Sequence, residues 1–557
     1  MLFVLNINFF FFFLFLFFFL FGLYFYLYNF VLVFDYNFLN MNSSEFSFIF
    51  LFDWLSLIFL SVVFLISGSV LLYSIDYMSG DNYIIRFFFL VFLFVFSMFM
   101  LIGMPDLICL IIGWDGLGLV SYCLVIYYQS SSTLSSGYLT LFINRLGDVF
   151  LILSICWCLN YGCWHYLYLY NLNLNLFMLI FFFLACLTKS AQFPFSSWLP
   201  SAMAAPTPVS SLVHSSTLVT AGLYLMIRFN MFLMGYLNFF LLNLSILTIL
   251  LSGFSAIYEN DLKKIIAYST MGQLSFMIFI LLMGCNYLSF MHLLIHAVFK
   301  SLLFLCSGIF IKGFMGVQDI RFMGNLSIQS PLISSCFLIS LFSLCGLPFY
   351  SGYFSKDFML ELFILSEVNF IYFFFFFLSI YLTLIYSLRL FMNLFIFNVG
   401  LNMFNLFEFN YMSFSCFFLM TISVFLGSMF FWLFDSGFFF VFDFFFKYLI
   451  LIFMFFFMIF YNCFNFNNFN FKSFYIYFFS NMMFLPFFSS NYVVSKFYNF
   501  SHLMFLVVEL GWTEYLISSS LIKILNFLNL YFNKMILNSF KIYFFSLLIF
   551  MVLIFFM

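Results

Sequence analysis

Charge is scarce in this 557-residue sequence: only 6% of the residues are Asp, Glu, Lys or Arg, whereas 67% are hydrophobic. A soluble domain carries roughly 25% charged residues, so the composition excludes a soluble globular protein. The net charge of -2 argues against a nucleic-acid partner and against a polybasic membrane-surface patch. The chain has 12 cysteines but no C-x-x-C pair, so it offers no motif for an iron–sulfur cluster.

The sequence instead contains a series of apolar runs long enough to cross ~30 Å of hydrocarbon. Examples lie at 3–34, 48–75, 84–103, 134–159, 264–283, 370–396, 437–460 and 542–557. Only helices and closed barrels satisfy the backbone inside a bilayer, and runs of this length are typical of helices. We therefore expect an all-α polytopic membrane protein with about 14–16 transmembrane helices.

Ionisable residues inside such apolar sequence are candidate functional residues, because burying them in a membrane is costly. The first is Asp115 in GWDGLGLVSY, whose glycines would let neighbouring helices approach closely. The alternative is an interfacial aspartate that caps a helix. Arg145 and Asp148 in INRLGDVFLI are three residues apart and share a helical face. They form either part of a polar path or a purely structural ion pair.

Lys189 follows the apolar run LFMLIFFFLACL and precedes four of the chain's 8 prolines. Proline breaks the helical hydrogen-bond ladder, and broken backbone at membrane depth must be buried in protein or face water. We therefore expect Lys189 at an interrupted helix beside water; the alternative is a lysine that reaches out to the membrane surface. His214 follows on the next apolar segment, among serine and threonine hydroxyls that can hold water.

The segment FMHLLIHAVFKSLLF places His292, His296 and Lys300 four residues apart, on one face of a helix. Histidine titrates near physiological pH, so this spacing predicts a proton relay. H-x-x-x-H is also a metal-ligand spacing. Lys300 on the same face, with no carboxylate on the helix, argues against a metal ion.

A second interrupted segment is CGLPFYSGYFSKDFMLEL, where Lys356 and Asp357 follow a Gly/Pro break. Two interrupted apolar segments with buried lysines indicate an internally repeated transporter fold, with halves at 105–260 and 261–397. Asp261 and Lys263, at the junction of these halves, join the polar path or lie at an exposed helix start.

Six motifs carry a family resemblance, in family order: GWDGLGLVSY, RLGDVFL, KSAQFPFSSWLPSAMAAPTPVSSLVHSSTLVTAGLYL, DLKKIIAYSTMGQL, HLLIHAVFKSLLFLCSG and GYFSKD. Over about 45–400 the chain resembles the subunit 5 family of NADH:ubiquinone oxidoreductase, respiratory complex I. The resemblance implies two inverted repeats with interrupted helices, a lateral helix at 511–540 and an anchor span at 541–557. The remaining segments, 1–104 and 398–510, would hold further transmembrane helices.

The resemblance further implies a proton-translocating membrane-arm subunit of the mitochondrial inner membrane, driven by redox chemistry elsewhere in the complex. NADH, FMN, iron–sulfur clusters and ubiquinone would be bound by other subunits, and this chain would bind no cofactor or metal. Its partners would be other membrane-arm subunits, especially a neighbouring antiporter-like one, together with lipid, ordered water and protons.

Site roles also follow from the resemblance. Asp115 and Lys189 would form the carboxylate–lysine pair of the proton-uptake half. The family usually has glutamate at the Asp115 position, so the shorter side chain predicts a stretched or water-bridged pair. The resemblance also implies a central axis formed by His214, His292, His296 and Lys300. Lys356 would be the terminal lysine of the other half. Further positions of the polar axis would be Arg145, Asp148, Asp261 and Lys263.

Two rival functions remain. A multisubunit cation/proton antiporter would share these motifs, although the expected lateral helix and anchor argue against it. A structural scaffold with relic charges would tolerate replacement of its lysines.

Overall fold

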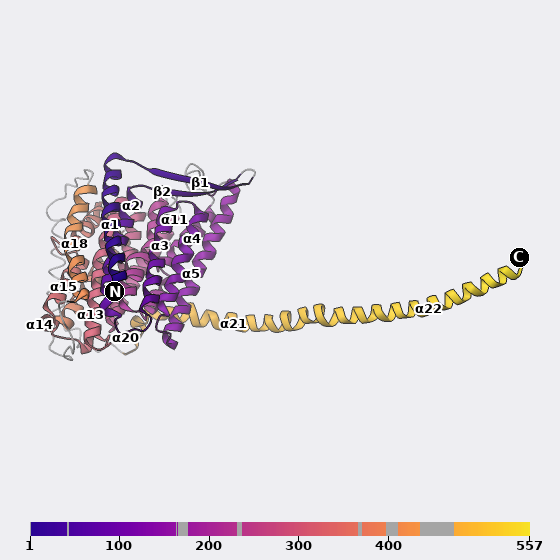
Figure 1. Cartoon of the computed structure of the whole chain (residues 1–557). Coiled ribbons are helices and arrows are strands. Elements are labelled where there is room, and N and C mark those ends of the chain that lie inside the picture. Colours follow the sequence, from indigo (N-terminus) through magenta and orange to yellow (C-terminus); the bar gives the residue numbers. More distant parts are fainter. Residues whose placement is uncertain are drawn as a thin grey trace. The chain divides into compact units, whose positions relative to one another are not determined.

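The computed structural model describes residues 2–41, 44–162, 164, 176–230, 237–365, 370–396, 410–434 and 473–556. These residues form two compact units, Met1–Pro486 and Phe487–Met557. The first unit is a bundle of helices (Figure 1). The predicted span at 437–460 lies outside the described residues.

The long helices of the first unit follow the apolar runs of the sequence. Their bounds are α1 Leu2–Tyr28, α2 Trp54–Tyr77, α3 Ile84–Gly103, α4 Leu107–Val125, α5 Ser131–Cys158, α10 Leu218–Arg228, α11 Leu237–Tyr258, α12 Leu262–Leu282, α13 Asn286–Gly313, α16 Ser351–Leu365, α17 Phe370–Phe391 and α18 Tyr411–Phe434. Across the described ranges, 12 helices are long and apolar enough to cross a membrane, one of them in the second unit. Two shorter apolar helices, α7 (Leu176–Lys189) and α15 (Pro331–Cys345), bring the total to the lower end of the predicted range. The all-α polytopic prediction is confirmed.

A β-hairpin between α1 and α2 is an addition that the apolar runs do not predict. Strands β1 (Leu32–Met41) and β2 (Ser44–Phe52) pair antiparallel, so the runs 3–34 and 48–75 are each part helix and part strand. In β2 the alternate residues Ser47, Ile49 and Leu51 are buried, which is the two-residue period of a strand with one covered face. The hairpin leads directly into Asp53, the N-cap of α2.

Both predicted helix breaks are present. Helix α7 ends at Lys189, and the chain resumes through short turns, η2 (Phe195–Ser197), α8 (Trp198–Ala202) and α9 (Thr207–Val209). It continues as a π-helical segment, η3 (Ser210–Thr217), and then as α10. Helix α15 ends at Cys345, where Gly346 adopts a φ of 80°, and α16 begins at Ser351. Lys189 therefore precedes its break, whereas Lys356 follows its own.

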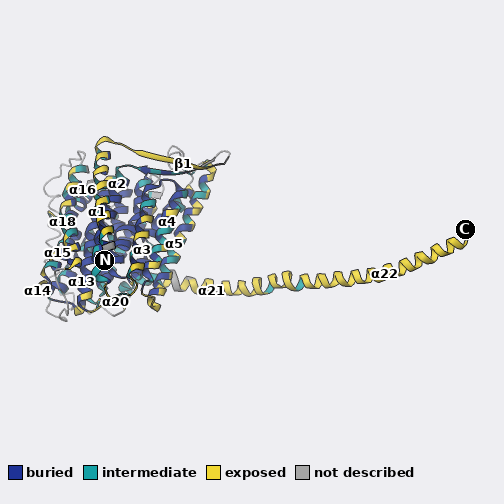
Figure 2. Ribbon diagram, viewed as in Figure 1, coloured by how far each residue is buried: buried dark blue, intermediate teal, exposed yellow. Residues whose placement is uncertain are grey.

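The segments that carry His214, His292, His296 and Lys300 form the interior of the bundle (Figure 2). All residues of 289–311 in α13 are buried, as are those of 207–227. Helix α1, by contrast, exposes large side chains such as Phe9 and Phe13. This is the burial pattern expected where lipid surrounds the outer helices and protein surrounds the polar ones.

The second unit is helical from Val493 to Phe556, through α21 (Val493–Met504), η10 (Phe505–Ser520) and α22 (Leu521–Phe556). The 62-residue segment Val494–Phe555 would extend up to about 93 Å at the α-helical rise of 1.5 Å per residue, three times the hydrocarbon thickness. The helix begins before 511 and continues through 540/541, the boundary between lateral and anchor helices that the family resemblance implies. No proline follows Pro486 and the only later glycine is Gly511, so nothing in the sequence ends the helix there.

Candidate functional site

Lys189 is fully buried at the C-terminal end of α7. Its Nζ donates a hydrogen bond to the main-chain oxygen of Trp114, 2.6 Å away, and lies 4.0 Å from the centre of the Trp114 ring. The end of a helix favours a cation, and an aromatic face attracts one. Lys189 therefore points into the protein instead of reaching the membrane surface.

The nearest charged neighbours of Lys189 come from α4 and α5. Arg145 Nη1 lies 3.3 Å from Asp115 Oδ2 and 3.1 Å from Asp148 Oδ2. Asp148 is the more buried of the two carboxylates, with 10% of its side chain exposed against 33% for Asp115. Lys189 and Asp115, both described, form no ion pair with each other. Asp115, for which the sequence predicts a stretched or water-bridged pair with Lys189, thus makes no direct contact with it, and Arg145 joins both carboxylates.

Small residues bring these helices together. A Cβ on Gly147 would collide with the Thr188 hydroxyl, so glycine is what lets α5 lie against the end of α7. A Cβ on Gly113 would come within 2.5 Å of the Leu101 main-chain nitrogen, where α4 meets α3. Gly118 is different, because its added Cβ would make an ordinary 3.8 Å contact with Asn144. The predicted close approach is thus confirmed at Gly113 and is not required at Gly118.

The break after α7 is closed by polar side chains. Trp198 Nε1 donates to the Thr188 oxygen at 3.0 Å, which satisfies one of the carbonyls at the end of α7. Thr248 of α11 donates to Gln192 Oε1 at 2.6 Å. His214 lies beyond this break, fully buried, with its ring centre 6.1 Å from that of Trp198. Neither of its ring nitrogens has a hydrogen-bond partner within the described residues.

Two adjacent lysines at the junction between the predicted halves, Lys263 and Lys264, have different surroundings. Lys263 is buried, and its Nζ donates to the Ala205 oxygen, 3.2 Å away in the interrupted segment. Lys264 instead pairs with Asp261, 2.8 Å away, and with Glu259, 3.4 Å away. Of the two open interpretations, the geometry gives Lys263 an inward position and places Asp261 at a partly exposed helix start.

The His292–His296–Lys300 stripe on α13 lies wholly inside the protein. His292 Nδ1 is 2.7 Å from the Ser355 hydroxyl, and its Nε2 is 3.2 Å from Gln273 Oε1. The His292 and His296 ring centres are 6.3 Å apart. Lys300 donates to the Ser269 hydroxyl. Both nitrogens of His292 are thus engaged by neutral polar groups.

Lys356 lies at the second break. Its Nζ donates to the oxygens of Leu344 and Cys345, both 3.4 Å away, and to Thr383 Oγ1 at 3.3 Å. These carbonyls end α15, so Lys356 occupies the favourable position for a cation at a helix C-terminus. Asp357 is the next residue of α16 and is half-buried.

A small cavity lies between these groups. Its volume of about 10 Å³ is at the lower limit for one water. Its walls include Lys356 and Thr383, together with Ser269 and Gln273, the partners of Lys300 and His292. The cavity therefore touches the hydrogen-bond partners of all three titratable groups. Within the described ranges, no group of three or more His, Cys, Asp or Glu side chains could hold a metal ion.

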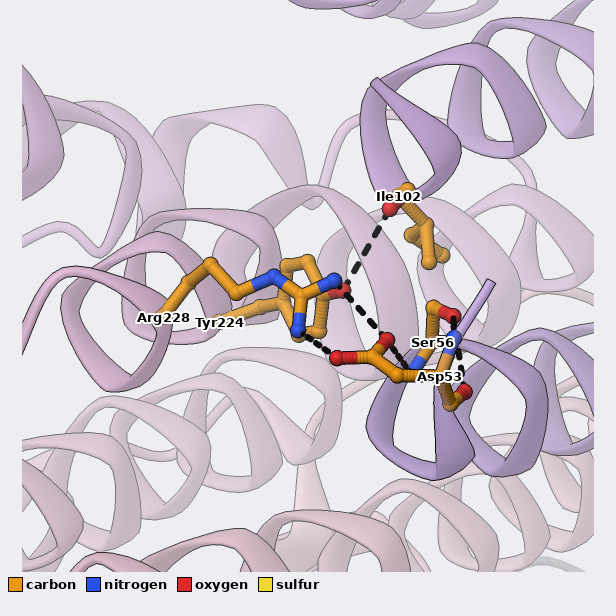
Figure 3. Close-up of polar contacts among 5 residues, drawn as sticks. All are labelled: Asp53, Ser56, Ile102, Tyr224 and Arg228. Atoms are coloured by element: carbon orange, nitrogen blue, oxygen red, sulfur yellow. Dashed lines mark hydrogen bonds and ion pairs between the residues drawn. The ribbon is translucent and has the colours of Figure 1, made fainter. Parts of the chain in front are cut away.

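Sequence reasoning missed the neutral members of this site. Gln273 and Ser355 stood inside quoted motifs, and an amide within an apolar helix was the available signal. It also missed Asp53 and Arg228, which form a two-pronged ion pair between the start of α2 and the end of α10 (Figure 3). The signal there was an aspartate inside the apolar run 48–75 and an arginine directly after the apolar segment LYLMI.

Known proteins are similar to this chain in fold and in sequence. The fold is similar to a chain of the Mrp complex from Dietzia sp. DQ12-45-1b, with a TM-score of 0.64, 23% sequence identity, and coverage of 78% of this chain and 51% of that chain. Residues 104–383 match the family described as NADH:quinone oxidoreductase/Mrp antiporter, TM. The fold and these matches define a polytopic membrane protein of the antiporter-like class. Residues 38–88 match the N-terminus of complex I chain 5, and residues 386–557 match the C-terminus of NADH dehydrogenase subunit 5. This chain belongs to the NADH-ubiquinone oxidoreductase chain 5 family.

Two relatives support the assignment over most of the chain. The NADH-ubiquinone oxidoreductase chain 5 of Locusta migratoria is 44% identical over 520 residues, which cover 90% of each chain. That of Aedes aegypti is 53% identical over 390 residues, 69% of this chain and 67% of the relative. The resemblance predicted from six motifs is confirmed, and the matches extend beyond 400 to the last residue.

Proposed function

We propose that this chain translocates protons in the membrane arm of NADH:ubiquinone oxidoreductase, in the mitochondrial inner membrane. The path runs along the buried Lys, His and carboxylate groups from Lys189 to Lys356. Redox chemistry in partner subunits, which bind NADH, FMN, iron–sulfur clusters and ubiquinone, supplies the energy. The neighbouring membrane-arm subunits are its partners.

The observation that carries this proposal is how the buried lysines are held. Within the described chain, the hydrogen bonds of Lys300 and Lys356 go only to neutral oxygens. A lysine tied to a single buried carboxylate would leave an unpaired charge when it lost its proton. Proton loss from these two lysines removes a buried charge instead of creating one. Each of these lysines can therefore gain or lose its proton when a neighbouring charge moves.

The first cluster supplies such a movable charge. Arg145 contacts both Asp115 and Asp148, and both carboxylates act on Lys189. A shift of Arg145 toward one carboxylate changes the field at Lys189 and hence its proton occupancy. Along the chain, His214 and Lys263 come between this cluster and the α13 stripe, and both are buried.

Replacing Lys189 or Lys356 with methionine tests this function. Both variants should lower the number of protons moved per NADH oxidised, while the amount of assembled complex in a native gel stays normal. Lys312→Met is the matched control. Lys312 lies on α13 with Lys300, but it is exposed, and its Nζ donates to the Asp76 oxygen at 2.6 Å. An unchanged proton-to-NADH ratio in both Lys189→Met and Lys356→Met would contradict the proposal.

A cation/proton antiporter is the second candidate, favoured by the structural likeness to a chain of the Mrp complex. Co-migration decides between the two functions. A chain of complex I migrates with NADH dehydrogenase activity in a native gel, whereas an antiporter subunit migrates with a smaller assembly that lacks it.

A further inference from the structure

Trp114 lies in the middle of α4, is fully buried, and contacts the Lys189 side chain in two ways. Its main-chain oxygen accepts a hydrogen bond from Lys189 Nζ at 2.6 Å, and the centre of its indole ring lies 4.0 Å from the same nitrogen. A carbonyl oxygen has two lone pairs, so it can accept the lysine in addition to a helical hydrogen bond. The lysine nitrogen thus contacts both a main-chain dipole and an aromatic face.

The two contacts respond differently to the proton of Lys189. A neutral amine still carries N–H groups, so the hydrogen bond to the Trp114 oxygen can persist after the lysine loses its proton. The attraction of the aromatic ring acts on a cation and disappears with the charge. Tryptophan exerts the strongest such attraction among the aromatic side chains, and burial away from water increases it. The ring therefore favours the protonated lysine over the neutral one.

This ring contact distinguishes Lys189 from the other buried lysines of the site. Within the described residues, Lys263, Lys300 and Lys356 donate to main-chain and hydroxyl oxygens, and none of them lies over an aromatic ring. The remaining cation–ring contacts in the described part of the chain are 4.9 Å or longer and involve exposed or partly exposed side chains. The lysine of the first interrupted segment therefore has a partner that the lysine of the second does not.

The charged groups that act on Lys189 are Asp115 of α4 and Arg145 and Asp148 of α5. Arg145 lies 3.3 Å and 3.1 Å from the two carboxylates and offsets part of their charge. Helix α10 also packs on α7, but it does so through the uncharged Gly222, against the main chain of α7. The indole is thus the group of α4 that contacts Nζ directly, while the charges act from farther away.

The edge of the Trp114 ring makes no such contact. Its indole nitrogen is buried and has no hydrogen-bond partner within the described residues. Trp198, by contrast, donates from its Nε1 to the Thr188 oxygen at the end of α7. Replacing the Trp114 side chain therefore removes the ring face from Lys189 and leaves the main-chain hydrogen bond of the lysine in place.

We propose that Trp114 is a positioning residue of the proton path, whose ring holds Lys189 in its protonated form until a neighbouring charge moves. The inference rests on the proposed function and deepens it. With the ring in place, Lys189 keeps its proton while Arg145 bridges the two carboxylates. A shift of Arg145 toward the lysine supplies the repulsion that offsets the ring attraction and frees the proton.

Trp114→Phe and Trp114→Leu test this role in the intact complex, reconstituted into vesicles. Both variants keep the main-chain oxygen, and both leave a smaller apolar side chain in place of the indole. They differ chiefly in the aromatic face, because phenylalanine keeps a weaker ring attraction and leucine has none. The measurement is the number of protons moved per NADH oxidised as a function of pH.

Loss of the ring attraction makes the protonated lysine less stable, so Lys189 should lose its proton at a lower pH. The pH at which the ratio falls on the alkaline side should therefore decrease from the unaltered chain to Trp114→Phe and further to Trp114→Leu. Complete loss of a desolvated contact of this kind corresponds to about one pH unit. A merely structural role would lower the amount of complex and leave this midpoint unchanged.

Trp157→Phe is the matched control. The Trp157 ring of α5 also packs against α7, but its partner is the ring of Phe177, with the two ring centres 5.7 Å apart. The same substitution there removes the same atoms without touching a lysine. Its pH midpoint should equal that of the unaltered chain.

The outcomes separate two failures. Equal midpoints in the unaltered chain and both Trp114 variants overturn the inference, and so do equal shifts in Trp114→Phe and Trp114→Leu, which would show a packing effect. If Trp114→Leu does not assemble, the midpoint of Trp114→Phe against that of Trp157→Phe decides. In each case the proposed function stands if Lys189→Met loses pumping. If Lys189→Met and Lys356→Met both pump normally, the proposed function itself falls.

Discussion

Lys189 donates its hydrogen bond to the main-chain oxygen of Trp114, the residue directly before Asp115. The lysine thus reaches the turn of α4 that carries Asp115. It contacts the main chain and the indole ring of Trp114 there, and not the Asp115 carboxylate. A main-chain oxygen cannot be protonated or moved away, so this contact fixes the position of the lysine. The charged groups that can act on it, Asp115, Asp148 and Arg145, lie farther away.

Asp148→Asn should impair pumping more than Asp115→Asn does. Asp148 lies closer to Arg145 than Asp115 does, 3.1 Å against 3.3 Å. Its side chain is also less exposed, 10% against 33%, so its charge is less screened by water. The measurement is protons moved per NADH for each variant at equal complex levels. The reverse order would show that Asp115 controls the lysine.

Gly147→Val should destabilise the first cluster. The added side chain would collide with Thr188 next to Lys189, and overpacking of this kind typically costs about 1–3 kcal/mol. The expected result is a lower yield of assembled complex and a lower thermal unfolding temperature. Gly118→Ala is the control, because its Cβ meets nothing closer than Asn144 at 3.8 Å. Equal stability of the two variants would refute the packing argument.

The apolar runs and breaker residues of this sequence predicted most of the fold. Runs such as 84–103 and 264–283 became α3 and α12 almost to the residue, because period and length are local properties. The hairpin was missed because its strands are as apolar as the helices beside them. The family resemblance implied a boundary between two helices at 540/541, but the residues there include no proline or glycine that would end a helix.

The sequence pointed to the buried charges of the candidate site but not to their partners. His292, Lys300 and Lys356 stood out because ionisable groups are rare in apolar sequence. Which oxygen each one contacts depends on helices up to 75 residues away, as for Lys189 and Trp114. Asp53 and Arg228 are 175 residues apart, so their pairing leaves no spacing pattern to read.

Lys263→Met should impair pumping, whereas Lys264→Met should not. Lys263 is buried and donates to the Ala205 oxygen in the interrupted segment, so its loss leaves that oxygen without this donor. Lys264 is 41% exposed and pairs with Asp261 at the surface, where an ion pair contributes about 0–1 kcal/mol. Adjacent positions and identical substitutions make the two variants a matched pair. Parallel losses in both would mean that the helix start, and not the inward lysine, matters.

Ser355→Ala should alter the protonation of His292 without unfolding the site. The hydroxyl lies 2.7 Å from Nδ1, and Gln273 Oε1 lies 3.2 Å from Nε2, so the amide oxygen requires the proton on Nε2 and the serine then donates to Nδ1. Without the serine, Nδ1 loses its donor and the imidazole is free to exchange its proton between nitrogens. A net hydrogen bond contributes about 1 kcal/mol, so stability should change little.

The imidazole itself gives the readout. In the complex labelled at histidine nitrogens, magnetic resonance should show His292 in one tautomer in the unaltered chain and in both tautomers in Ser355→Ala. Ser340→Ala is the control, because that hydroxyl is equally buried but donates to the Phe337 oxygen of its own helix at 2.8 Å. A single, unchanged tautomer in Ser355→Ala would show that Gln273 alone sets the proton, and the serine would then have no part in the relay.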